Sequence, residues 1–114
     1  IARPDGGYLE FNQSPSGQWA VYAFDDYRQG MTHQPGVEIR NGIREQDDGR
    51  LQVSGVLDLD RMNLGQGPWR IGLSAVIETV DGAISYWALA HPSDKPDFHH
   101  PDSLVLELPP MELA

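Results

Sequence analysis

Potentially reactive side chains are most concentrated between Pro92 and Pro101, where acidic, basic and imidazole groups gather within a few residues. Imidazole and carboxylate groups are ligand types for Zn²⁺ and other transition metals. The spacing, however, matches no standard metal-binding motif. Adjacent histidines on an extended chain also point in opposite directions. We therefore predict a structural loop, with Asp97, His99 and His100 as the weak candidates for metal ligands.

A second candidate site follows from Asp81-Gly82, a pair typical of a two-residue hairpin turn. That turn would pair Val80 with Ala83 and fix the register of both arms. Because strand side chains alternate between faces, one face of the hairpin should be polar around a large indole. This predicted platform comprises Trp87, Ser74, Glu78, Ser85 and His91.

An indole can stack on the apolar face of a pyranose while polar neighbours hydrogen-bond the sugar hydroxyls. The alternative is that Trp87 packs beneath a covering segment, as Trp residues usually do. The opposite face of the hairpin is almost entirely apolar, and we assign it to the core. It comprises Leu73, Ala75, Ile77, Ile84, Tyr86, Ala88 and Ala90.

The segment from Gly7 to Gln13 alternates in the same way, with Tyr8, Glu10 and Asn12 on one face. Glu10, Asn12 and the nearby Trp19 form a second tier of ligand-binding candidates. Carboxylate and amide oxygens suit a small ligand or Ca²⁺. A solvated strand face is the other interpretation, and for this strand alone the sequence favours it.

The residues that several other kinds of functional site require are absent from the sequence. The chain has no cysteine, which excludes disulfides, thiol catalysis and zinc–thiolate sites. It has no Gly-rich phosphate loop and no nucleophile elbow. Haem needs axial His or Met ligands, and Met31, Met62 and Met111 lie in no recognisable haem context. We expect no catalysis and no cofactor. A Ca²⁺ or Zn²⁺ site is supported only by the presence of the ligand types named above.

The charge balance narrows the partners. With 17 acidic and 8 basic residues, the formal net charge is −9, and this field repels phosphate backbones and anionic lipids. No apolar run approaches the roughly 20 residues of a membrane helix. We expect a soluble protein that binds neither nucleic acid nor membrane, and the sequence leaves its compartment open between cytoplasm and periplasm.

Short strand-like runs are separated by turn residues throughout the chain, and no helical period is evident. One helical turn is conceivable near residues 60–63. Such spacing predicts an all-β antiparallel sandwich or barrel in a single domain spanning 1–114. The predicted strands cover 7–13, 18–24, 37–44, 50–59, 69–79, 84–91 and 104–108.

Two long segments carry a resemblance to a known family. The run YLEFNQSPSGQWAVY from Tyr8 to Tyr22 resembles a stretch of bacterial DOMON-like proteins, and so do LSAVIE at 73–78, SYWAL at 85–89 and KPDFHH at 95–100. The subgroup is the one named for its association with a reductase of muramic-acid synthesis. The resemblance implies an immunoglobulin-like β-sandwich related to family 9 carbohydrate-binding modules, without naming a ligand.

Family members carry further strands before the segment that begins here at Ile1, so the resemblance implies a chain lacking its N-terminal strands; a naturally shorter variant is the alternative. A sandwich without those strands would expose edges and apolar faces. The partners expected on this ground are the missing segment, or further copies of the chain in a homo-oligomer or strand exchange.

Three functions remain open. The first is a module that binds carbohydrate or another small ligand, for which Trp87 should be partly exposed in a concavity. The alternative is a structural or protein-interaction module that docks through a sheet face or edge. The third is a metal-dependent enzyme, which needs His91, His99 or His100 to converge with Asp97 or Asp102. The sequence favours them in that order.

Overall fold

The computed structural model describes residues 1–34, 36–62 and 64–110, so Met111 lies outside the described residues. The described chain is all-β, as predicted, and its only helical elements are two short 3₁₀ turns, η1 (Leu59–Arg61) and η2 (Pro101–Ser103). Its strands pair antiparallel in several small sheets, an arrangement compatible with a β-sandwich. None of the described helical elements has the length and apolar character needed to cross a bilayer.

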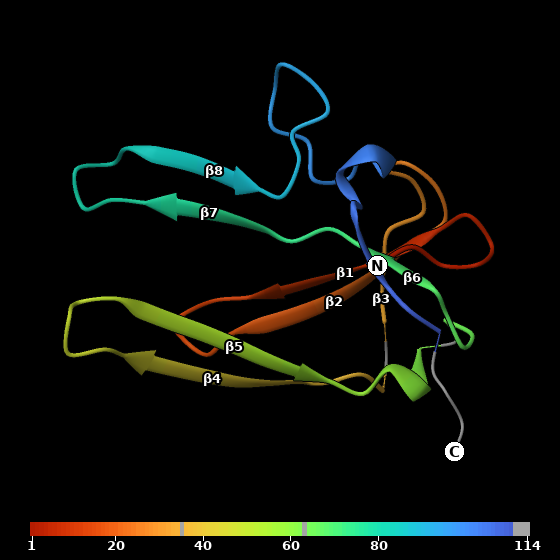
Figure 1. Ribbon diagram of the computed structural model, residues 1–114, viewed down its shortest axis with the longest axis horizontal. Coiled ribbons are helices and arrows are strands. Elements are labelled where there is room, and N and C mark those ends of the chain that lie inside the picture. Colours follow the sequence, from red (N-terminus) through yellow and green to blue (C-terminus); the bar gives the residue numbers. More distant parts are fainter. Residues whose placement is uncertain (35, 63, 111–114) are drawn as a thin grey trace.

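Three hairpins form most of the molecule. They are β1 (Tyr8–Gln13) with β2 (Trp19–Phe24), β4 (Ile39–Glu45) with β5 (Leu51–Leu57), and β7 (Ser74–Glu78) with β8 (Ile84–Ala88). In Figure 1 the three hairpins extend toward the same side, with β1–β2 drawn between the other two. The short strand β3 (Thr32–His33) adds to β2, within a segment that the sequence predicted to be a loop.

The predicted strand over 69–79 is wrong as a single element. It divides into β6 (Trp69–Ile71) and β7, and β6 pairs instead with β9 (Leu106–Leu108). The break falls at Gly72, where a Cβ atom would lie 3.1 Å from the carbonyl oxygen of Ser103. Glycine lets the chain pass η2 this closely without displacing it. The two halves of the apolar run pair in different sheets.

The hydrophobic core lies on one face of β1–β2. Leu9 and Val21 are each 2% exposed, and Trp69 is buried with its indole N–H 3.3 Å from the carbonyl oxygen of Leu64. Leu9 and Phe11 share this face, as the alternation predicted. The buried cluster comprises Leu9, Val21, Ala23, Val37, Ile39, Met62, Leu64 and Trp69.

The hairpin β7–β8 does not contribute to this core, so the core assignment of its apolar face is wrong. Leu73, Ile77, Ile84 and Tyr86 are between 47% and 54% exposed. The observed pairs place Ala75 and Ile77 on the face opposite Ile84 and Tyr86. Within the described residues, β7 and β8 also pair only with each other. An apolar pattern shows that a face can be buried, but it does not show what buries it.

Candidate functional site

The predicted platform around Trp87 rested on a two-residue turn, and the structure has a three-residue loop instead. Thr79 N donates to the carbonyl oxygen of Ala83, and Gly82 adopts a φ of 88°. This geometry is that of a three-residue hairpin loop with glycine in the left-handed region. Trp87 therefore pairs with Ala75, rather than with Val76 as predicted.

The register shift of one residue divides the predicted platform between two faces, because side chains alternate along a strand. Trp87 and Ser85 share a face with Ala75 and Ile77, while Ser74 and Glu78 lie on the opposite face. His91 follows the end of β8 and is exposed. The prediction that these five residues form one polar surface is wrong.

Trp87 itself is 60% exposed, and its indole N–H donates to the hydroxyl of Ser85 at 2.9 Å. The binding hypothesis required that Trp87 be partly exposed and that it lie in a concavity. The first requirement is met, but Trp87 lines neither of the two hollows found in the described structure. Trp87 thus lies on an open face rather than in a pocket.

The face of β1 that carries Tyr8, Glu10 and Asn12 meets the loop from Pro92 to Pro101, the histidine-rich loop, in a hydrogen-bonded cluster. Tyr8 Oη lies 2.8 Å from Nδ1 of His99, and Nε2 of the same ring lies 3.3 Å from Glu10 Oε2. Asn12 Nδ2 donates to Glu10 Oε1 at 2.7 Å, and Arg28 N donates to Tyr8 Oη at 3.1 Å. Sequence reasoning kept these residues in separate candidates, and the fold joins them.

The His99 ring is held at both of its nitrogens by strand β1. Tyr8 Oη, which accepts from Arg28 N, contacts Nδ1, and the Glu10 carboxylate contacts Nε2. Tyr8 and Glu10 are two residues apart on the same strand face, so the strand sets the orientation of the ring.

A second set of contacts surrounds Asp97. Its carboxylate accepts hydrogen bonds from the hydroxyl of Tyr27, from Arg28 Nη2 at 3.1 Å and from His99 N at 3.1 Å. Burial opposes the charge, but these bonds from Tyr27, His99 N and Arg28 hold the pKa of Asp97 below its ordinary value. Arg28 has a φ of 53°, a conformation that a non-glycine residue rarely adopts.

This arrangement fastens the 97–99 segment to the β1–β2 hairpin and does not resemble an activated catalytic group. Burial raises the pKa of the Tyr8 phenol, which opposes formation of a phenolate nucleophile or base. His100 Nδ1 accepts from Asp102 N, and the His91 ring lies 6.3 Å from that of Phe98. The imidazoles are thus engaged separately, and among the described residues no three potential ligands are grouped to hold a metal ion.

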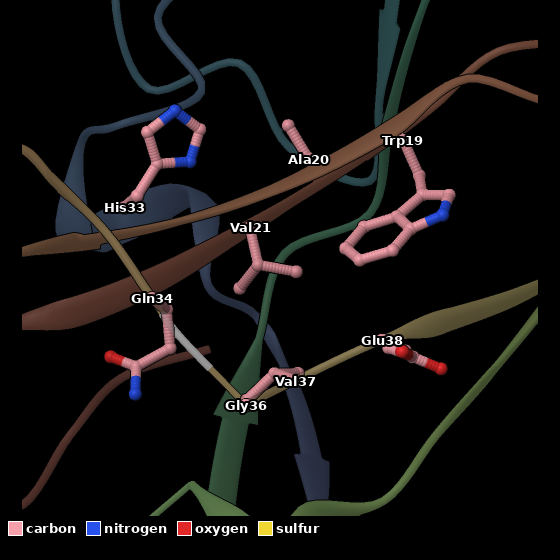
Figure 2. Close-up of a pocket in the computed structure, with 8 residues that line it drawn as sticks. All are labelled: Trp19, Ala20, Val21, His33, Gln34, Gly36, Val37 and Glu38. Carbon is pink, nitrogen blue, oxygen red and sulfur yellow. The ribbon is translucent and has the colours of Figure 1, made fainter.

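A hollow lies between β2 and the chain that leads into β4, away from the Tyr8–His99 cluster. It has a volume of about 420 Å³, and the indole of Trp19, 42% exposed, forms one wall. Its lining residues are Trp19, Ala20, Val21, His33, Gln34, Gly36, Val37 and Glu38. Figure 2 shows Trp19 and Val21 pointing from β2 toward the 36–38 segment, whereas His33 and Ala20 point the other way.

The hollow combines an apolar floor with a few polar groups. Val21 and Val37 are 2% and 5% exposed and close its base. Glu38 and Gln34 are the polar residues that line it on the side opposite β2. Of these residues, sequence reasoning singled out only Trp19. The sequence predicted a strand that begins at Val37 after a loop containing Gln34, which gave no reason to place either residue opposite the indole.

No protein-family model, curated protein or solved structure matches this chain.

Proposed function

We propose that the protein is a non-catalytic binding module whose ligand is a neutral carbohydrate, held in the hollow beside Trp19. The observation that carries the proposal is the hollow of about 420 Å³ with a half-exposed indole in its wall. Small-molecule sites are typically concavities of roughly 300–1,000 Å³, mostly apolar, with few polar groups. The hollow fits this description in size and in lining.

The chemistry of the lining favours a sugar over a wholly apolar ligand. A pyranose presents C–H groups on one face, which suit the Trp19 indole, and hydroxyls at its rim, which suit the Glu38 carboxylate and the Gln34 amide. The formal net charge of −9 and Glu38 itself disfavour acidic sugars. The resemblance to DOMON-like domains points to the same class of function.

The test is a fluorescence titration with neutral mono- and oligosaccharides, with muramic-acid derivatives as the anionic arm. We expect a saturable change in tryptophan fluorescence that Trp19→Ala abolishes. Trp87→Ala is the matched control, because it also removes an exposed indole but should leave binding unchanged. Saturable binding that survives Trp19→Ala would place the ligand elsewhere, and no binding of any saccharide would refute the proposal.

A protein-interaction role is the second candidate, and a separate observation favours it. The β7–β8 hairpin exposes large apolar side chains on both faces, including Val76, Trp87 and Leu89 at 54–60%. Contiguous apolar patches of this kind usually mark interaction sites. This surface is distinct from the Trp19 hollow, so the two roles are tested independently.

A further inference from the structure

Strand β8 has one edge that is unpaired in the described structure. Leu89 N donates to Leu73 O, and Thr79 N donates to Ala83 O. Hydrogen-bonded and non-hydrogen-bonded pairs alternate along an antiparallel ladder, so Ser85 and Trp87 direct their backbone groups toward β7. The N–H and C=O groups of Ile84, Tyr86 and Ala88 therefore point away from β7.

This edge lacks the features by which proteins protect exposed strands. Natural edges carry charged residues, prolines or bulges that prevent pairing with another chain. The sequence of β8 is ISYWA, which has none of them. In the view of Figure 1, β8 lies at the upper boundary of the molecule, with no strand drawn beyond it. Its backbone groups are thus available to an incoming strand.

The hairpin also lacks the support that an isolated pair of strands needs. A two-stranded hairpin is marginally stable in water unless a third strand or a packing surface joins it. Eight large side chains between Leu73 and Leu89 are each 47% exposed or more. In a sheet extended along β8, the side chains of Ile84, Tyr86 and Trp87, which are 47–60% exposed, would gain cross-strand neighbours.

From these observations we infer that β8 pairs antiparallel with β8 of a second copy of this chain, around a two-fold axis at Tyr86. Tyr86 would then face Tyr86 of the second copy, and Ile84 would face Ala88. All outward backbone groups of β8 are satisfied in this register, giving about six new hydrogen bonds. The product is a symmetric four-stranded sheet, and its closed two-fold interface forms no open-ended fibre.

Charge supports a second copy as the occupant. Between Gly72 and Ala90 the only charged residues are Glu78 and Asp81, near the tip of the hairpin, and β8 has none. Two acidic molecules therefore meet with little repulsion at this strand. The same segment has no Lys or Arg, so it lacks the basic groups that attract nucleic acid or anionic lipid.

The test is the solution mass measured by sedimentation over a wide range of protein concentration. We expect the mass to rise from that of the monomer toward twice that value. Added salt should strengthen the dimer, because it screens repulsion between two chains that each carry a formal charge of −9. A monomer at every concentration and salt level would overturn the inference, and would leave the ligand proposal at the Trp19 hollow unaffected.

A matched pair of proline variants separates the two edges of the hairpin. Tyr86→Pro removes an N–H that points out from β8, and Val76→Pro removes the equivalent N–H on the outer edge of β7. Tyr86→Pro loses two bonds at the two-fold axis, so we expect it to weaken the dimer about tenfold or more. Val76→Pro should leave the dimer unchanged; equal effects of the two variants would overturn the edge assignment.

A cysteine variant tests the register without removing a hydrogen bond. The chain has no cysteine, so Tyr86→Cys introduces the only thiol. Hydrogen-bonded antiparallel pairs have Cα atoms about 5.5 Å apart, within the range that a disulfide spans. We expect rapid oxidation of Tyr86→Cys to a covalent dimer and slow oxidation of the control Val76→Cys. Equal rates, or faster oxidation of the control, would contradict a two-fold axis at Tyr86.

Discussion

Replacement of Asp97 with Asn tests how the histidine-rich loop is fastened to the β1–β2 hairpin. The Asp97 carboxylate is 12% exposed and accepts from Tyr27, Arg28 and His99 N. An amide of the same shape keeps part of the acceptor capacity, but it loses the charge and places an NH₂ group among donors.

The expected loss of stability can be worked out from these contacts. The ion pair with Arg28 contributes little, about 0.5 kcal/mol, because the Arg28 side chain is 52% exposed. The half-buried bond from His99 N and the bond from Tyr27 contribute about 1 kcal/mol between them after partial retention by the amide. We therefore expect a loss of between about 1 and 2 kcal/mol, or roughly 4–16 °C in Tm.

The pH dependence gives the sharper result. The folded-state pKa of Asp97 lies below its unfolded value of about 3.9. The stabilisation is therefore fully present above about pH 5 and is lost as the pH falls through the folded-state pKa. Urea denaturation of wild type and Asp97→Asn should show a difference that shrinks steadily between about pH 5 and pH 3.

The matched control is Asp94→Asn, an exposed carboxylate of the same loop. It should change stability by less than about 0.5 kcal/mol at any pH. A pH-independent difference between Asp97→Asn and wild type, or an equal effect of the control, would refute the role assigned to Asp97.

Two further substitutions test the cluster and the core. Tyr8→Phe keeps the ring stacked on Phe24 but removes the hydroxyl between Arg28 N and His99 Nδ1, so it should cost about 1 kcal/mol in urea denaturation; no loss would show that the hydrogen-bonded chain adds nothing to stability. Leu9→Ala opens a cavity in the core at a side chain that is 2% exposed and should cost about 2–4 kcal/mol; a loss below 1 kcal/mol would argue against that core.

Local pattern was enough to predict the all-β fold and most of its strands. The alternation of Leu9 and Phe11 against Tyr8 and Glu10 placed these pairs on opposite faces of β1, and the structure packs the face of Leu9 and Phe11 against the core. The hydrophobic pattern did not predict the strand register of the β7–β8 hairpin, because that register depends on the length of the loop. Asp81-Gly82 is compatible with loops of two or three residues, and the one-residue difference moved Trp87 to the face opposite Ser74 and Glu78.

The candidate sites depended on contacts that no local pattern contains. Tyr8 and His99 are 91 residues apart in the chain, so their hydrogen bond follows from the path of the loop after β8. The hollow beside Trp19 depends likewise on where the segment before β4 crosses β2. Sequence identified Trp19 and Glu10 as candidates by residue type, and tertiary structure determined which neighbours each one has.

The most direct test of the ligand proposal is NMR observation of the indole N–H groups, since the chain has only three tryptophans, at 19, 69 and 87. Titration with a neutral oligosaccharide should shift the Trp19 resonance in a saturable way. The resonances of the buried Trp69 and the exposed Trp87 should stay in place. If no saccharide in the panel moves the Trp19 resonance, or if Trp87 alone responds, carbohydrate binding in the Trp19 hollow is contradicted.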